Sequence, residues 1–186
     1  MPEPRVVLLT GATGLVGELL ARGFAEAGDR VIGVARDPLL LDGPRARLGE
    51  SFVPLALDLS EAGAPRSLAA SLTGGGPAVV VHAARDAAQL GLGGGGVTRE
   101  QWLAAYALEV VVPYELVTAL AAAAGSRLRS AVLVGSMYGV VAPTPALYDD
   151  FAGESAPHYG TGKAALARPH QHAHAEAFAR RREEAA

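Results

Sequence analysis

Two side chains near the end of the sequence have the types and the spacing of an acid–base pair. Tyr159 and Lys163 lie four residues apart, which places both side chains on one face of a helix. An ammonium group beside a phenol makes the phenol a stronger acid, so Tyr159 would exchange a proton with an oxygen of a bound molecule. The other tyrosines have no lysine four positions on. Taken alone, the Y-x-x-x-K pattern is also typical of an exposed pair on a helix.

A glycine turn near the start of the chain is the second motif with chemical meaning. The apolar segment RVVLLT runs directly into TGATGLVG, and a helical pattern follows at once. Gly11 permits a tight turn, Gly14 lets a phosphate approach the backbone, and Gly17 lets the helix pack closely on the strand. The free N–H groups and the dipole at the start of the helix attract pyrophosphate, which predicts a dinucleotide site. The alternative is a glycine-rich turn that holds no ligand.

Residues at the ends of two further apolar segments are candidates for contacting the nucleotide. The second segment ends in VARD, and the position where NAD-preferring folds often carry an acid holds Ala35, followed by Arg36. A guanidinium here favours a 2′-phosphate and therefore NADP, with a solvated loop residue as the alternative. Asp58 ends the third segment, where it would bind an adenine amino group or cap the next helix together with Ser60.

Apolar, β-branched segments alternate with helical patterns along the whole chain. We expect helices at 14–28, at 98–125 with a bend near Pro113, and around Tyr159, and strands at 5–10, 29–36, 51–60, 77–84 and 128–136. Continuous apolar strands between helices are typical of a parallel sheet covered on both faces. The sequence therefore predicts an α/β fold with a Rossmann-type, doubly wound parallel sheet in a single domain, residues 1–168. The glycine-rich segment 91–96 is expected to form a mobile loop.

Composition excludes several classes of function. The 186 residues carry a net charge of −3, half are hydrophobic and 19% are charged, which gives no reason to expect nucleic acid or a membrane as partner. There is no cysteine, so disulfides, thiolate catalysis and cysteine metal sites are excluded, and no metal site is expected. The first residues lack the pattern of a signal peptide, and no apolar run approaches the length of a membrane span. We therefore expect a cytoplasmic protein.

Together, these motifs resemble the short-chain dehydrogenase/reductase family over about residues 5–168. TGATGLVG, VVVHAA and GSMYG followed by ESAPHYGTGK resemble its extended members, which include nucleotide-sugar epimerases and dehydratases, whereas GKAAL resembles the shorter reductases. The resemblance implies a catalytic centre of Ser136, Tyr159 and Lys163, with Ser136 at the end of the fifth strand binding the same substrate oxygen as the phenol. It also implies NADP, with NAD as the alternative, held by Thr10, Gly11, Thr13, Gly14, Leu15, Gly17, Arg36, Asp58, Leu59, His82, Ala83, Ala84, Tyr159 and Lys163.

Two features depart from the pattern of this family. Active short reductases usually carry an asparagine in the long helix, which supports a proton relay through the lysine, and counting from Trp102 places Glu109 there. A buried carboxylate at this position would alter the relay and pair with Lys163. The family also continues with a sixth strand and a loop over the nicotinamide. Here Pro169 would break the helix near Arg168, and residues 169–186 have the composition of a polar helix or frayed tail, as a truncated or frame-shifted reading frame would produce.

Three functions therefore remain open from the sequence. The first is an NAD(P)-dependent oxidoreductase that transfers hydride between NADP(H) and a carbonyl or secondary-alcohol substrate. The second is a truncated, catalytically impaired cofactor-binding subunit that partners a full-length relative, and the third is a nucleotide-sugar epimerase- or dehydratase-like fragment. A homodimer is expected because the long helix is apolar on more than one face, with Val110, Val111, Val112, Leu116 and Val117.

Overall fold

The computed structural model of the chain describes residues 4–86, 90 and 96–166. They form two compact units. The first is built from the residues up to Ala84 together with Glu115–Val134, and the second from Arg85–Tyr114 and the residues from Gly135 onward. The predicted tail at 169–186, the helix break at Pro169 and most of the predicted loop at 91–96 lie outside the described residues.

The first unit contains a five-stranded, entirely parallel sheet in the order β3-β2-β1-β4-β5. Its strands are β1 (Val6–Thr10), β2 (Arg30–Ala35), β3 (Phe52–Ala56), β4 (Val79–His82) and β5 (Ser130–Leu133). Each strand coincides with one of the predicted segments and is a little shorter, because the outermost residues of each segment belong to the connecting turns. The predicted parallel Rossmann-type sheet is therefore confirmed.

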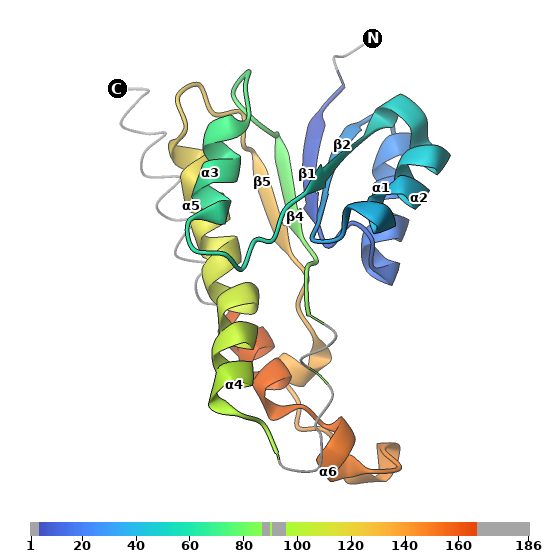
Figure 1. The fold of residues 1–186 in the computed structure, drawn as a ribbon, viewed down its shortest axis with the longest axis vertical. Coiled ribbons are helices and arrows are strands. Elements are labelled where there is room, and N and C mark those ends of the chain that lie inside the picture. The colour runs from blue at the N-terminus through green and yellow to red at the C-terminus, as the bar shows by residue number, and fades with distance from the viewer. Residues whose placement is uncertain (1–3, 87–89, 91–95, 167–186) are drawn as a thin grey trace. The chain divides into compact units, whose positions relative to one another are not determined.

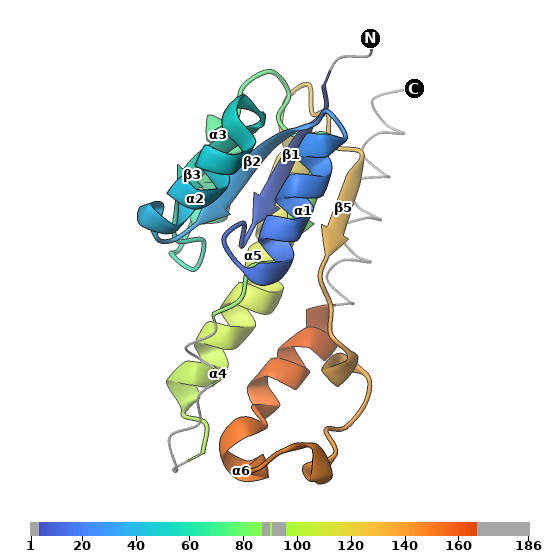
Figure 2. The ribbon, with the colours of Figure 1, turned by 90° about the vertical axis from the view of Figure 1, so that its right-hand side faces the viewer.

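Helices cover both faces of this sheet, as a doubly wound fold requires. Figure 1 shows α1 and α2 on one face and α3 and α5 on the other, and Figure 2 shows α1 lying across the sheet. Their bounds are α1 (Leu15–Glu26), α2 (Pro38–Leu48), α3 (Ala64–Ser71) and α5 (Val112–Ala122). The helices α2 and α3 were not predicted from the sequence. Gly43 and Pro44 disturb the helical pattern of α2, although Asp37 caps its start by accepting a hydrogen bond from the N–H of Leu39.

Close backbone packing holds α1 against the sheet. A side-chain carbon at Gly17 would overlap the carbonyl oxygen of Gly11 and lie 2.9 Å from the Cα of Ala12. The role predicted for Gly17, close approach of the helix to the strand, is thereby confirmed. The buried cluster beside it joins strands and helices of this unit: Val7, Leu9, Ala12, Ala21, Val31, Leu41, Phe52 and Val81.

The second unit is mainly helical. Its elements are α4 (Arg99–Tyr106), the π-helical turn η3 (Ala107–Val111), the 3-10 turns η4 (Met137–Gly139) and η5 (Pro145–Leu147), α6 (Phe151–Glu154) and a helix over 157–166. Thr98 and Gln101 form a capping box at the start of α4. The predicted long helix is present as Arg99–Ala122, and its irregularity, the π turn η3, ends two residues before Pro113, where the sequence predicted a bend.

The long helical stretch Arg99–Ala122 is long and apolar enough to cross a membrane, with a mean hydropathy of 1.5. This is weak evidence for a membrane span, because the core helix of a soluble protein meets the same criteria. Of the 18-residue apolar segment that meets them, 44% is buried inside the protein. Of the five apolar residues that favoured a dimer, Val110, Val112, Leu116 and Val117 are buried within the single chain. The exposed apolar side chains of this stretch are instead Leu103, Tyr106 and Val111, with Trp102 partly exposed.

Two glycines of α1 provide a matched test of this packing. Gly17→Ala should lower the free energy of unfolding by about 1–3 kcal/mol, because the added methyl forces the helix away from β1. Gly23 has no atom within 4 Å of the place where a side-chain carbon would lie. Gly23→Ala should therefore raise the free energy of unfolding by about 0.5–1 kcal/mol through helix propensity alone. Urea denaturation measures both, and equal effects of the two substitutions would contradict the packing described for Gly17.

Candidate functional site

The carboxyl ends of the strands in the first unit gather most of the predicted cofactor residues. The order β3-β2-β1-β4-β5 reverses direction between β1 and β4, and ligands of open parallel sheets bind at such a switch point. The glycine turn follows β1, Arg36 follows β2, Asp58 lies two residues beyond β3, and His82 ends β4. Residues from distant parts of the sequence, such as Gly11 and His82, thus lie along one edge of the sheet.

The glycine turn leaves open space above the first turn of α1. Gly11 has a φ of +69°, and a side-chain carbon there would lie 2.7 Å from the backbone of Ala84, so both the turn and the closeness of β4 require glycine. Gly14 is the N-cap of α1 and provides no side-chain cap. A side-chain carbon on Gly14 would meet one protein atom within 4 Å, the carbonyl oxygen of Gly11 at 3.5 Å. The start of α1 thus has no side-chain cap on its N–H groups, and N–H groups at a helix start favour an anion.

Buried hydrogen bonds of Thr10 and His82 hold the backbone next to this turn. The Thr10 Oγ1 and the His82 Nδ1 are 2.9 Å apart, and the N–H of Ala84 donates to the same hydroxyl over 3.3 Å. Both residues are fully buried. Their side chains therefore tie the end of β1 to the end of β4, which fixes the backbone around Gly11.

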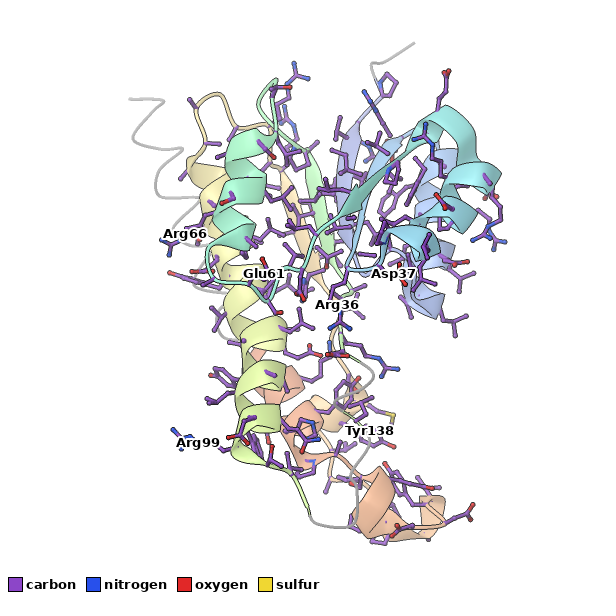
Figure 3. All side chains as sticks on the ribbon, viewed as in Figure 1. Arg36, Asp37, Glu61, Arg66, Arg99 and Tyr138 are labelled. Carbon is purple, nitrogen blue, oxygen red and sulfur yellow. The ribbon has the colours of Figure 1, made fainter. Side chains whose placement is uncertain are left out.

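Arg36 and Asp58 stand on the outer strands of the same edge. Arg36 is exposed at the end of β2 (Figure 3). One carboxylate oxygen of Asp58 accepts hydrogen bonds from the N–H and the hydroxyl of Ser60, at 2.9 and 2.6 Å. This closes a turn, but the N-cap of α3 is Gly63, so the helix-capping role considered for Asp58 and Ser60 is wrong. The neighbouring Leu59 is buried, which anchors the turn to the core.

The second unit brings Tyr159 and Lys163 together, as their spacing predicts. Both lie on the helix over 157–166, and the Lys163 Nζ is 5.8 Å from the centre of the Tyr159 ring. The guanidinium carbon of Arg85 lies 6.0 Å from the centre of the same ring. Two cations therefore approach the phenol from different segments. The sequence analysis did not identify Arg85, although its place three residues after the end of β4 was a signal.

Glu109 forms a buried ion pair with Lys163, which confirms the pairing expected from the sequence. The Glu109 Oε2 and the Lys163 Nζ are 2.6 Å apart, and each side chain is only 4% exposed. Burial raises the pKa of the Glu109 carboxyl above its ordinary value, against the opposing effects of the Lys163 ammonium and of Arg85. The lysine of the predicted catalytic set thus has a buried counter-charge beside it.

Ser136 is the N-cap of η4 and lies partly buried. Its hydroxyl oxygen accepts a hydrogen bond from the N–H of Tyr138 over 3.2 Å. This contact leaves the hydroxyl hydrogen of Ser136 to donate. The Tyr138 hydroxyl accepts in turn from the Tyr148 hydroxyl over 2.8 Å, and this hydrogen bond raises the pKa of Tyr148.

A groove of about 840 Å³ opens beside Tyr159 in the second unit. Its lining is largely apolar and aromatic, with Arg85 and Glu154 as charged members, and it includes Val141, Pro143, Tyr138, Tyr148 and Phe151. Residues from Tyr138 to Ala156 form one wall of this groove. Sequence reasoning did not single out the three aromatic residues, since they lie in an irregular segment without periodicity.

A smaller cavity adjoins the other side of Tyr159. It is lined by Glu109 together with Arg85, Asp86, His158 and apolar neighbours. His158 is 1% exposed, and its ring meets the ring of Trp102 edge-on, with 6.0 Å between the centres. Within residues 4–86, 90 and 96–166, no three His, Asp or Glu side chains are grouped so as to hold a metal ion.

Comparison with solved structures supports the same fold. A short-chain dehydrogenase from Streptomyces avermitilis is 29% identical, with a TM-score of 0.70 over 89% of this chain and 58% of that one. A metagenomic short-chain oxidoreductase solved in complex with NADP is 25% identical, with a TM-score of 0.68 over 87% of this chain and 70% of that one. Both are longer than this chain, which spans little more than half of the first.

Comparison with known sequences points the same way. A serine 3-dehydrogenase from Agrobacterium fabrum is 36% identical over 69 residues, which cover 37% of this chain and 28% of that protein. The model of the NAD dependent epimerase/dehydratase family matches residues 7–180, most of the sequence. The chain therefore belongs to the NAD dependent epimerase/dehydratase family, and it shares the fold of the short-chain dehydrogenases.

Proposed function

We propose that the chain is an NADP(H)-dependent oxidoreductase that interconverts a carbonyl compound and a secondary alcohol. The observation that carries this proposal is the phenol of Tyr159, which borders an open groove and has the Lys163 ammonium 5.8 Å from its ring. A titratable hydroxyl beside a cation, at the wall of a groove, is equipped to exchange a proton with a bound oxygen. Because the chain spans only part of its relatives, its whole activity is part of the proposal.

The glycine turn of the first unit is the proposed site of the nucleotide. The backbone of Gly11, Thr13, Gly14 and Leu15 would hold the pyrophosphate at the start of α1, and Gly17 keeps this helix on β1. Arg36 would pair with a 2′-phosphate, which favours NADP over NAD, and Asp58 and Leu59 would border the adenine. When bound, such a nucleotide supplies the hydride that is exchanged with the substrate carbon.

Tyr159 is the proposed acid–base group of the reaction. In carbonyl reduction its hydroxyl would donate a proton to the substrate oxygen, and in alcohol oxidation the phenolate would accept one. Lys163 would place a positive charge beside the phenol and bind the ribose hydroxyls of the nucleotide, and Ser136 would donate a hydrogen bond to the substrate oxygen. His82, Ala83 and Ala84, at the end of β4, would border the nucleotide through their backbone.

The groove beside Tyr159 supports a substrate whose bulk is apolar. Aromatic and aliphatic side chains form most of its lining, and a volume of about 840 Å³ admits a molecule much larger than acetone. Arg85 and Glu154 provide the charged positions at which polar substituents of the substrate would be recognised.

The oxidoreductase is favoured over the two alternatives that the sequence left open. The solved structures that resemble the chain include dehydrogenases and oxidoreductases, and the sequence relative is a dehydrogenase. Tyr159 and Lys163 are both present, which a catalytically impaired subunit would not need. The proposal includes a cytoplasmic enzyme that works as a homodimer.

Removal of the phenol hydroxyl tests the catalytic role of Tyr159. Tyr159→Phe should reduce turnover of an aryl ketone with NADPH by about 10²–10⁴-fold, the usual contribution of general acid–base catalysis, while the dissociation constant of NADPH changes little. Tyr106→Phe is the control, since Tyr106 is an exposed tyrosine of α4. NADPH absorbance and fluorescence titration provide the two measurements. Parental activity in Tyr159→Phe would exclude this residue as the proton donor.

The choice of nucleotide is tested at Arg36. Arg36→Ala should weaken binding of NADPH by about 1–3 kcal/mol and leave NADH binding nearly unchanged, because a charge-assisted contact with the 2′-phosphate is lost. Arg30→Ala changes an exposed arginine at the opposite end of the same strand and should affect neither nucleotide. Isothermal titration compares the four affinities. Equal losses for NADPH and NADH would remove Arg36 from the phosphate site.

The exposed apolar side chains of the long helix are the proposed dimer surface. Leu103 is 59% exposed and Tyr106 is 45% exposed. The parent protein should scatter light as a dimer at micromolar concentration, and Leu103→Glu should convert it to a monomer by placing a charge in the apolar contact. Leu39→Glu, at an exposed leucine of α2, should remain dimeric. A monomeric parent protein would contradict the proposal.

A further inference from the structure

We infer that the groove beside Tyr159 takes a hydroxy acid or oxo acid, whose carboxylate is bound by Arg85 next to the reacting carbon. The inference deepens the proposed function and rests on it, since it names the class of substrate that the groove would admit. Its basis is the place of Arg85, which lines the groove and whose guanidinium carbon lies 6.0 Å from the centre of the Tyr159 ring.

Arg85 is the cationic side chain of the groove lining among the residues that the structure describes. It is exposed, and it also lines the smaller cavity on the other side of Tyr159. A guanidinium carries several N–H donors in a planar fork, which matches the paired oxygens of a carboxylate. The same side chain can therefore lie against the Tyr159 ring and still donate hydrogen bonds to a bound anion.

The carboxylates around Arg85 are directed elsewhere than into the groove, with one exception. Arg85 acts electrostatically on Glu109, but the salt-bridge contact of Glu109 is the Lys163 ammonium at 2.6 Å. Asp86 lines the smaller cavity, whereas Glu154 is the acidic residue of the groove lining. The positive charge of Arg85 is therefore the one that a ligand in the groove meets beside Tyr159.

The charges of the groove have different neighbours. Arg85 lies against Tyr159, whereas Glu154 acts electrostatically on the hydroxyl of Tyr148. A carboxylate is attracted at the first position and repelled at the second. Tyr148 meets the ring of Phe151 edge-on, with 5.5 Å between the ring centres, so this part of the lining suits an apolar or aryl body. The groove thus favours one orientation, with the acid group beside Tyr159 and the apolar body against the aromatic wall.

The set of charges suits a carboxylate better than a phosphate. A phosphate carries more charge and more acceptor oxygens, and in this groove it would face Glu154 with a single arginine as its cationic partner. Because Arg85 lies against the ring of the proposed acid–base group, the carboxylate and the reacting oxygen would be only a few bonds apart. The α- and β-hydroxy acids and the corresponding oxo acids have this spacing.

Binding of an unreactive acid tests the inference without turnover. Hydrocinnamate should bind the parent chain about tenfold more tightly than hydrocinnamamide, which has the same shape and no charge, as measured by isothermal titration. Arg85→Gln should remove this preference by weakening the acid alone. Arg99→Gln should keep it, because Arg99 is an exposed arginine at the start of α4 and is not among the described residues of the lining. Equal binding of acid and amide to the parent, or an unchanged preference in Arg85→Gln, would overturn the inference.

The parent chain itself keeps the test decisive if Arg85→Gln fails to fold. Rising salt should reduce the preference of the parent for the acid, because ions screen the attraction of an exposed charge. Arg85→Lys keeps the charge and loses the planar fork, so it should retain part of the preference. A preference that salt leaves unchanged would mean that charge plays no part, and the inference would be wrong.

Turnover separates this inference from the proposed function. With NADP⁺, β-hydroxy-β-phenylpropionate should be oxidised with a kcat/KM about tenfold higher than its methyl ester, mainly through KM, and Arg85→Gln should abolish the difference. In this reaction the carbinol carbon loses a hydride to NADP⁺ and the hydroxyl loses its proton to Tyr159, which yields the oxo acid. Equal turnover of acid and ester would overturn the inference. Absence of turnover, with the unreactive acid still bound through Arg85, would reject the proposed function and retain Arg85 as the carboxylate site.

Discussion

The absence of side chains at Gly11 and Gly17 is the constraint on which the first unit depends. The carbonyl oxygen of Gly11 occupies the place where a side chain at Gly17 would begin, and the backbone of Ala84 occupies the place of one at Gly11. These contacts draw α1, β1 and β4 together at a single point. The N–H groups at the start of α1 are thereby fixed at the switch point of the sheet, where a phosphate would need them.

The polar contacts beneath the turn serve the same purpose. Thr10 and His82 are fully buried and lie across neighbouring strands, and the hydroxyl of Thr10 also accepts the N–H of Ala84. A buried hydroxyl must have hydrogen-bond partners, so this arrangement allows one backbone position at the end of β4 and disfavours others. The geometry of the proposed nucleotide site is thus determined by residues that are themselves inaccessible to a ligand.

In the second unit, the buried pair of Glu109 and Lys163 has the corresponding role. A lysine that serves a phenol and a nucleotide, as proposed for Lys163, needs a defined position. The Glu109 carboxylate lies 2.6 Å from the Lys163 ammonium, and both side chains are only 4% exposed. The helix accommodates the longer side chain through the π turn η3 and through Gly162 on the facing helix.

Local chemistry in the sequence determined a large part of this picture. Apolar, β-branched segments predicted all five strands, since a strand buried on both faces must be apolar throughout. The glycine spacing located the turn after β1, and the helical spacing of Tyr159 and Lys163 predicted that their side chains would meet. The pairing of Glu109 with Lys163 was expected from the resemblance to the short-chain dehydrogenases, which places Glu109 near the lysine. The helices α2 and α3 were missed, because glycine, proline and alanine obscure their periodicity while packing against the sheet maintains them.

The tertiary structure alone decided which of several local possibilities each polar residue adopts. The sequence around Asp58 is compatible with binding a ligand or with capping a helix. In the folded chain Asp58 closes a turn by accepting a hydrogen bond from Ser60, and Gly63 is the N-cap of α3. Arg85, Tyr138, Tyr148 and Phe151 come from two irregular segments without periodicity, and only the folded chain gathers them around one groove. Contacts between distant segments depend on the path of the backbone, and that path follows from packing of the whole unit rather than from local spacing.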